Sequence, residues 1–228
     1  MNRYTSGEYL KNNPGWHIED SAWKADNIRK LLDRSNLSIS TVADVGCGAG
    51  LIAQELGKAY PSIAFTGYDI SPDAKMFWEQ YDLPNVTYQQ ADFFDQNQHY
   101  DLVLCIDVFE HIPDYLGFLN RLRSQADYFV FHIPLDMHIQ GLLRDLQVTL
   151  RDSVGHLHYF SEMTAIATLA DCGFQHIDIT YTSRTLDMPK SFRSRILNIL
   201  RRSVFAILPS LAIKVFGGWS LLVLARRK

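Results

Sequence analysis

The sequence predicts an α/β fold in which helices cover both faces of a doubly wound, mostly parallel sheet. Apolar, strand-like runs alternate with helical patterns along residues 1–133, which is typical of consecutive βαβ units. The stretch "DLVLCID" (101–107) is apolar between its acidic ends, as expected of a central strand buried on both faces. A glycine-rich turn, "DVGCGAG" (44–50), lies between the first strand and the next helix and indicates a place where a ligand approaches the backbone.

The elements of the first half follow in a regular order. Strands are predicted at 41–46, 63–68, 86–89, 101–106 and 127–133. Helical patterns lie at 25–32, 50–60, 72–80 and 114–124. Since each strand is followed by a helix or a long connection, neighbouring strands are expected to be parallel.

The pattern changes after residue 134. Residues 139–150 carry five apolar side chains on one helical stripe. Ser161 is a predicted helix N-cap, and that helix is expected to end before Gly173. The stretches "QHIDITYT" (175–182) and "GGWSLLVLARRK" (217–228) are predicted to be the last two strands.

Composition and charge indicate where the protein works. The chain has 228 residues and three widely spaced cysteines, an odd number that favours a reducing compartment over a disulfide framework. The first residues lack the apolar core of a signal peptide, so we expect a cytoplasmic protein. Residues 190–228 hold nine basic residues and no acidic one, whereas residues 1–189 hold 13 basic and 25 acidic residues. Halves of opposite sign indicate a basic surface that meets an anionic partner.

The glycine turn is the first candidate site. Asp44, Gly46, Gly48 and Gly50 follow a strand at its carboxyl end, where open α/β sheets bind ligands. The spacing G-x-G-x-G differs from the dinucleotide fingerprint G-x-G-x-x-G, which disfavours a dehydrogenase, and no P-loop lysine follows. Glycines at such a turn also have a purely structural use, so this signal needs support from elsewhere in the chain.

Two acidic positions give that support. Asp69 ends the second strand in "GYDIS", where a carboxylate accepts hydrogen bonds from ribose hydroxyls; the alternative is that it caps the following helix. "QADFFD" follows the third strand, and its Asp92 and Phe93 pair an acceptor for an exocyclic amine with a ring that covers a purine.

These stretches, with "YDLVLCIDVFEHIPD", resemble the successive motifs of the class I S-adenosylmethionine-dependent methyltransferases. The resemblance implies a Rossmann-like, seven-stranded sheet of the methyltransferase type, with a helical insertion and a basic C-terminal segment. It implies S-adenosylmethionine as cofactor, with the methionine part at the glycine turn, the ribose on Asp69 and the adenine beside Asp92. The residues implied in cofactor binding are Asp44, Gly46, Gly48, Gly50, Asp69, Ile70, Asp92, Phe93 and Asp107.

The sequence has no internal repeat and no low-complexity linker, so it is interpreted as a single domain over 1–228. We expect a lid or helical segment at 1–40, a cofactor-binding core at 41–133, a substrate-side insertion and strand at 134–189, and a basic helical segment and last strand at 190–228. The aromatic cluster Trp16, His17 and Trp23 is interpreted either as part of a lid over the cofactor or as packing for the first helix.

Methyl transfer to a hydroxyl needs a general base, and histidine has a suitable pKa. His111 and His156 are the candidate catalytic residues because both lie where strands meet loops. No metal is expected, although Asp107, Glu110 and His111 form an alternative site for a divalent ion, as is thought of certain quinone O-methyltransferases with a similar "EH-P" pattern.

The basic tail is amphipathic over 191–216, but its charges and Pro209 argue against a membrane-spanning helix. It is predicted either to lie on a membrane surface or to pack on the domain as an ordinary helix. The function expected is O-methylation of a small molecule, a sugar or a lipid-linked intermediate; the alternatives are N-methylation and a non-catalytic cofactor-binding scaffold. A nucleic-acid acceptor is disfavoured by the acidic body. The sequence leaves the oligomeric state open.

Overall fold

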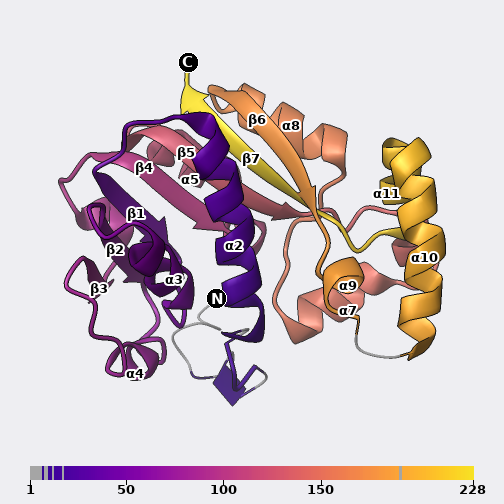
Figure 1. Ribbon diagram of the computed structural model, residues 1–228, viewed down its shortest axis with the longest axis horizontal. Helices are drawn as coiled ribbons and strands as arrows, with labels where there is room; N and C mark the ends of the chain where they lie inside the picture. Colours follow the sequence, from indigo (N-terminus) through magenta and orange to yellow (C-terminus); the bar gives the residue numbers. More distant parts are fainter. Residues whose placement is uncertain (1–6, 8–9, 12, 17, 190–191) are drawn as a thin grey trace.

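The computed structural model describes residues 7, 10–11, 13–16, 18–189 and 192–228. Seven strands form one sheet in the order β3-β2-β1-β4-β5-β7-β6 (Figure 1). The strands are β1 (Thr41–Val45), β2 (Ala64–Asp69), β3 (Val86–Gln90), β4 (Tyr100–Ile106), β5 (Ala126–Pro134), β6 (Phe174–Thr182) and β7 (Ser220–Arg227). β1 to β5 pair with one another in parallel, and β7 runs antiparallel between β5 and β6. The predicted fold, a mostly parallel seven-stranded sheet, is confirmed.

Helices cover both faces of this sheet. The longer ones are α2 (Ile18–Ser35), α3 (Leu51–Ala59), α5 (Tyr115–Leu122), α7 (Leu146–Ser153), α8 (Glu162–Asp171), α10 (Phe192–Ile207) and α11 (Pro209–Phe216). α2 and α3 pack on one face and α5 and α8 on the other, so the core has two layers of apolar side chains. β4 serves both layers, because Leu102 and Leu104 face α2 and α3 while Val103 and Cys105 face α5 and α8.

Two predicted helices differ from the observed ones. The helix expected at 72–80 is reduced to one turn, α4 (Lys75–Trp78), because the chain first forms a turn closed by the Asp69 carboxylate on the Ser71 amide. The helix expected at 139–150 is broken into α6 (Ile139–Leu142) and α7, with Asp145 between them in the left-handed region at φ 50°. This break turns the predicted apolar stripe outward, and Leu143 is 80% exposed.

The chain makes a long excursion between the last two strands. β6 and β7 are antiparallel neighbours, yet α9 (Arg184–Asp187), α10 and α11 lie between them in sequence. Figure 1 shows α10 at the edge of the molecule, beyond the sheet, with α11 behind it. Among the residues described, no helix has both the length and the apolar character needed to cross a membrane.

Candidate active site

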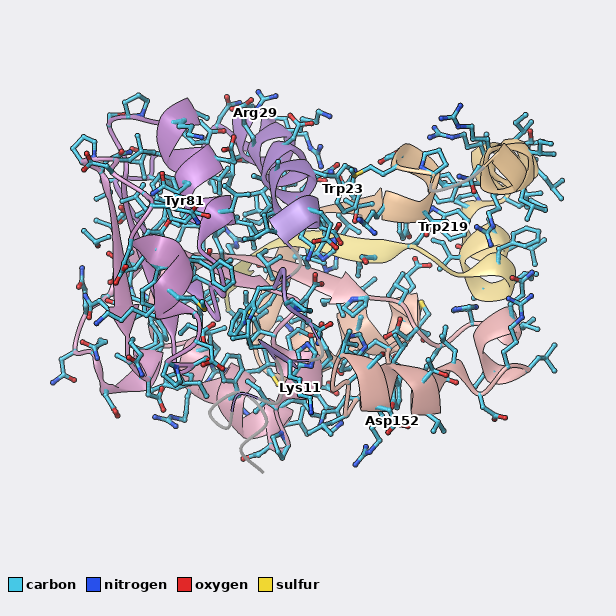
Figure 2. The ribbon with its side chains drawn as sticks, turned by 90° about the horizontal axis from the view of Figure 1, so that it is seen from below. Lys11, Trp23, Arg29, Tyr81, Asp152 and Trp219 are labelled. Atoms are coloured by element: carbon cyan, nitrogen blue, oxygen red, sulfur yellow. The ribbon has the colours of Figure 1, made fainter. Side chains whose placement is uncertain are left out.

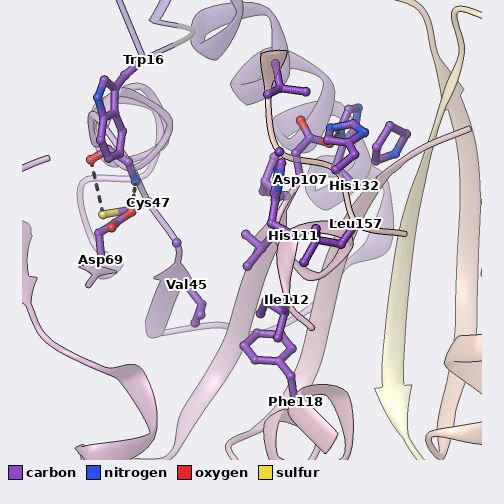
Figure 3. Close-up of a pocket in the computed structure, with 18 of the residues that line it drawn as sticks. Trp16, Val45, Cys47, Asp69, Asp107, His111, Ile112, Phe118, His132 and Leu157 are labelled. Carbon is purple, nitrogen blue, oxygen red and sulfur yellow. Dashed lines mark hydrogen bonds and ion pairs between the residues drawn. The ribbon is translucent and has the colours of Figure 1, made fainter. Parts of the chain in front are cut away.

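A cavity of about 1180 Å³ opens at the carboxyl ends of the parallel strands. The glycine turn and Asp69 form one side of it, and Asp107, His111 and His132 lie on the other (Figure 3). α2 contributes to its wall from one direction and α7 from another. The topology explains the position, since parallel strands that end at the same edge bring their following loops together.

The glycine turn needs bare backbone mainly for its own packing. Gly46, Gly48 and Gly50 have φ values of 72°, 53° and 79°, a region that disfavours residues with a Cβ atom. A Cβ atom on Gly46 would lie 2.8 Å from the Val108 side chain, and one on Gly50 would lie 2.5 Å from the Tyr88 ring. Gly46 and Gly48 line the cavity, whereas Gly50 lies behind them at the start of α3.

Asp69 joins this turn to the end of β2. Its Oδ2 accepts a hydrogen bond from the Gly48 amide at 2.9 Å, and its Oδ1 accepts one from the Ser71 amide at 2.8 Å. Burial raises the pKa of Asp69, while the two amides oppose this effect. A carboxylate oxygen can accept more than one hydrogen bond. Asp69 can therefore hold the local turn and still accept a hydrogen bond from a ligand in the cavity that it lines.

Asp44 lies at the end of β1 and is only 2% exposed. Its Oδ2 has no hydrogen-bond partner within the described part of the chain. Burial, with the nearby charge of Asp69, raises the pKa of Asp44 to about 7. A buried carboxyl in this state gains from a cation or donor placed against it.

The loops after β2 and β3 form a further part of the wall. Ile70 is 54% exposed and lines the cavity, and the Asp92 carboxylate accepts a hydrogen bond from the Phe94 amide at 2.9 Å. The Phe93 ring packs against Tyr68 in the core and is 3% exposed, so only part of it reaches the cavity. Phe94, which the sequence analysis did not single out, lines the same wall beneath the Arg121 guanidinium.

Asp107 belongs to the first of two aspartate–histidine pairs in the cavity. It follows β4 in the left-handed region at φ 54°, and its carboxylate binds the Lys24 Nζ at 2.7 Å and the His132 Nδ1 at 2.6 Å. His132 also contacts the Thr182 hydroxyl through Nε2 at 2.9 Å. Burial alone would raise the pKa of Asp107, but His132 and Lys24 together hold it well below its usual range.

The second pair, Asp136 and His156, lies on the α7 side. The His156 Nδ1 is 2.7 Å from the Asp136 Oδ2, and both residues line the cavity. Since a carboxylate accepts the Nδ1 proton, the Nε2 of His156 is left with its lone pair. The His111 ring lies against the His156 ring with a centroid distance of 4.9 Å. The two predicted catalytic histidines are therefore brought together.

Glu110 lies behind these histidines and is fully buried. Neither of its carboxylate oxygens has a hydrogen-bond partner among the residues described, and burial together with Asp107 raises its pKa well above the usual value. Ligand atoms of Glu110, His111 and His156 lie within 4.8 Å of one another, so among the described residues this set has the spacing of a divalent-ion site. His156 takes the place of Asp107, which the sequence analysis expected in the set. Asp107 is instead engaged by Lys24 and His132.

Several lining residues were absent from the sequence predictions. Lys24 and Arg184 carried no local signal, because they reach the cavity through tertiary packing. Asp136 had one, since it stands two residues after the end of β5 at the ligand-binding edge. Trp16 and Trp23 line the cavity as a lid would, and His17 lies outside the described residues.

The sheet order and the cavity at its edge define a class I α/β methyltransferase fold. A family model described as a methyltransferase domain matches residues 16–179, which is more than half of the chain. The chain therefore belongs to this family of S-adenosylmethionine-dependent enzymes, and S-adenosylmethionine is the cofactor.

Two further comparisons agree at the level of family and fold. A ubiquinone biosynthesis O-methyltransferase of Hydrogenovibrio crunogenus is 31% identical over 81 residues, which are 32% of this chain and 33% of that protein. The match thus spans about a third of the relative's length. The magnesium protoporphyrin IX methyltransferase of Synechocystis PCC 6803, solved with bound SAH, superposes with a TM-score of 0.59 at 20% identity, covering 91% of this chain and 83% of that one. The cyclopropane synthase MmaA2 of Mycobacterium tuberculosis gives a TM-score of 0.63 at 14% identity and full coverage of both chains.

Proposed function

We propose that this protein transfers the methyl group of S-adenosylmethionine to a hydroxyl oxygen of a small molecule, a sugar or a lipid-linked intermediate. The observation that carries the proposal is the Asp136–His156 pair in the same cavity as the glycine turn. An oxygen nucleophile must lose its proton during transfer, and an imidazole held by a carboxylate suits that task. The printed name of the Hydrogenovibrio relative also describes an O-methyltransferase.

The cofactor is proposed to occupy the side of the cavity that contains the glycine turn. The methionine part would lie at Gly46 and Gly48, above Asp44, with Gly50 shaping the turn. Asp69 would bind the ribose, while Ile70, Asp92 and Phe93 would surround the adenine. Bound there, the cofactor supplies an activated methyl group on a sulfonium. The carboxylates of Asp44, Asp69 and Asp107 suit its cationic sulfonium and amino groups.

The acceptor is proposed to occupy the α7 side. The His156 Nε2 would take the hydroxyl proton, Asp136 would stabilise the imidazolium that forms, and His111 would position the acceptor beside it. Leu150, Val154 and Leu157 supply an apolar wall that excludes water from the reacting oxygen. Positioning the acceptor in line with the methyl group provides much of the remaining rate.

The enzyme is also proposed to work at a membrane surface. Contact with a membrane surface through residues 190–216 would bring a cytoplasmic enzyme to a lipid-linked acceptor. The exposed apolar residues of that segment and its basic charge support this contact.

A screen of hydroxyl and amine acceptors with methyl-labelled cofactor tests the reaction. We expect label on an oxygen, with turnover that falls in His156→Ala and His111→Ala at saturating cofactor. Label on a nitrogen with both variants fully active would assign N-methylation instead, because a neutral amine needs no base before transfer. Activity that survives chelation with EDTA supports proton transfer at the histidines. Activity lost to EDTA and restored by Mg²⁺ would assign Glu110, His111 and His156 to a metal.

A further inference from the structure

α10 packs on the rest of the protein through a side that contains both polar and apolar residues. Asn198 is 3% exposed and donates a hydrogen bond from Nδ2 to the Thr185 carbonyl at 2.6 Å. Phe205, seven residues later, stacks on Trp219 with a centroid distance of 5.4 Å. Figure 2 shows Trp219 on the same side of the molecule as α10, with Tyr81 on the opposite side. These two contacts fix which side of the helix faces inward.

The opposite side of α10 is apolar and faces solvent. Ile199 is 67% exposed and Ile207 is 77% exposed. At about 100° per residue, the exposed apolar residues span an arc of about 160°, centred opposite Asn198. They are Ile196, Leu197, Ile199, Leu200 and Ile207. An ordinary surface helix turns most of its apolar residues toward the protein, so an exposed apolar arc of this width is unusual.

Basic residues border this apolar arc on both edges. On the helical wheel, Arg195 lies about 40° beyond Ile199, and Arg201 lies about 40° beyond Leu197. Arg144, from the turn between α6 and α7, adds a positive charge near Arg201, where it lowers the pKa of that guanidinium together with burial. Residues 190–228 contain no acidic side chain to neutralise these charges.

Neighbouring helices extend the same kind of surface. α11 packs against both α10 and α6. Leu208 and Leu211 at the start of α11 are about half exposed, at 52% and 49%, and Leu142 of α6 is 56% exposed. α7 follows α6 directly and lines the cavity through Leu150 and Val154. α6, which belongs to the apolar surface, is thus followed in the chain by the helix that lines the acceptor side of the cavity.

We propose that α10, with the start of α11 and with α6, docks on the surface of an anionic lipid membrane and places the acceptor side of the cavity near the lipid. Apolar side chains in the centre with arginines at both edges match an interface where acyl chains lie beneath anionic headgroups. A second copy of this chain fits less well as the partner, because the arginines of the two copies would face and repel one another. The proposal rests on the membrane contact in the proposed function but not on methyl transfer itself.

Co-sedimentation of the full-length protein with vesicles tests this docking. Vesicles of equal parts phosphatidylglycerol and phosphatidylcholine are compared with phosphatidylcholine alone, at low and high salt. We expect binding to the anionic vesicles that weakens with salt. The double variant Ile199→Asn with Ile207→Asn keeps the charge and should lower the partition coefficient about tenfold or more. Arg195→Gln with Arg201→Gln keeps the apolar surface and should lower the partition coefficient by a similar factor.

Met76→Asn is the matched control, because Met76 is 60% exposed on α4, far from α10 in Figure 1. It should bind vesicles as the wild type does, and all variants should bind S-adenosylmethionine normally by calorimetry. Wild-type protein that stays in the supernatant with anionic vesicles would overturn the proposal, as would unchanged binding by the isoleucine variant. Sedimentation of the free protein as a dimer that the isoleucine variant dissociates would assign the surface to a second copy. A wild-type protein that does not bind S-adenosylmethionine would contradict the methyltransferase function but not the membrane docking.

Discussion

The cavity contains two aspartate–histidine pairs, Asp107–His132 and Asp136–His156, and these pairs are held differently. Asp107 binds both His132 and Lys24, and His132 uses its second nitrogen on Thr182, so the atoms of this pair are saturated by the protein. Asp136 binds His156 through one nitrogen, and the His156 ring packs edge-to-face against the His111 ring. A saturated pair suits a fixed electrostatic wall, whereas the second pair retains a nitrogen for proton transfer. The same residue types therefore differ in expected role because of their partners.

The largest expected effect comes from exchanging the two histidines for a residue that cannot take a proton. His156→Gln should lower turnover at saturating cofactor about 10²–10⁴-fold, the usual contribution of a general base, with cofactor affinity unchanged. His132→Gln should act mainly on stability, because His132 is buried between Asp107 and Thr182. Turnover and calorimetry of both variants measure the contrast. Equal loss of turnover in the two would remove the distinction between the pairs.

Removing the charge of Asp107 should produce the largest loss of stability. Asp107→Asn leaves the Lys24 ammonium, whose side chain is 16% exposed, without its carboxylate. Breaking such a pair costs about 2–4 kcal/mol in free energy of unfolding. Asp136→Asn should cost less, since His156 can remain neutral. Urea denaturation of the two variants tests this order, and Lys24→Met in the Asp107→Asn background should restore part of the loss. A variant pair with equal stability would show that the Lys24 contact contributes little.

Asp69 sharpens the comparison from the cofactor side. Asp69→Ala removes the proposed charge-assisted hydrogen bonds to the ribose, together worth about 1.5–3 kcal/mol, so the affinity for S-adenosylmethionine should fall roughly 10–100-fold. The variant also loses the bonds to the Gly48 and Ser71 amides, so folding must be checked by circular dichroism. Asp92→Ala is a useful companion, since its carboxylate holds only the Phe94 amide. Unchanged affinity in a folded Asp69→Ala protein would defeat the ribose assignment.

The smallest expected effect is a pH dependence that originates at Asp44. Its pKa is raised to about 7 in the folded protein from an ordinary value of 3.8, so the folded state keeps a proton that the unfolded chain releases. Stability of the cofactor-free protein should therefore fall as pH rises from about 4 to 7 because of this group. Asp44→Asn should flatten the curve between pH 5 and 8. An Asp44→Asn variant whose stability depends on pH as steeply as that of the wild type, measured by thermal unfolding, would contradict this prediction.

Local signals in the sequence were sufficient for the sheet and for much of the cofactor side. The alternation of apolar runs predicted the strands, and Gly46, Gly48 and Asp69 line the cavity, whereas Asp44 and Gly50 are not among its lining residues. Helix 72–80 was predicted too long, because periodicity does not register a turn closed by a side chain such as Asp69. Phe93 was predicted on the adenine face, and its ring lies largely within the core.

The sequence by itself determined the fold class, the edge at which ligands bind and the amphipathic character of the tail, because each depends on the order of residues along one strand, turn or helix. Tertiary contacts were needed to show that Lys24 reaches Asp107, that Asp136 holds His156, and that α10 leaves an apolar arc in solvent. Periodicity shows that a helix has two unlike sides, but the side that is buried depends on contacts between residues far apart in the chain. For α10 those contacts are Asn198 on Thr185 and Phe205 on Trp219, and they leave Ile199 and Ile207 in solvent.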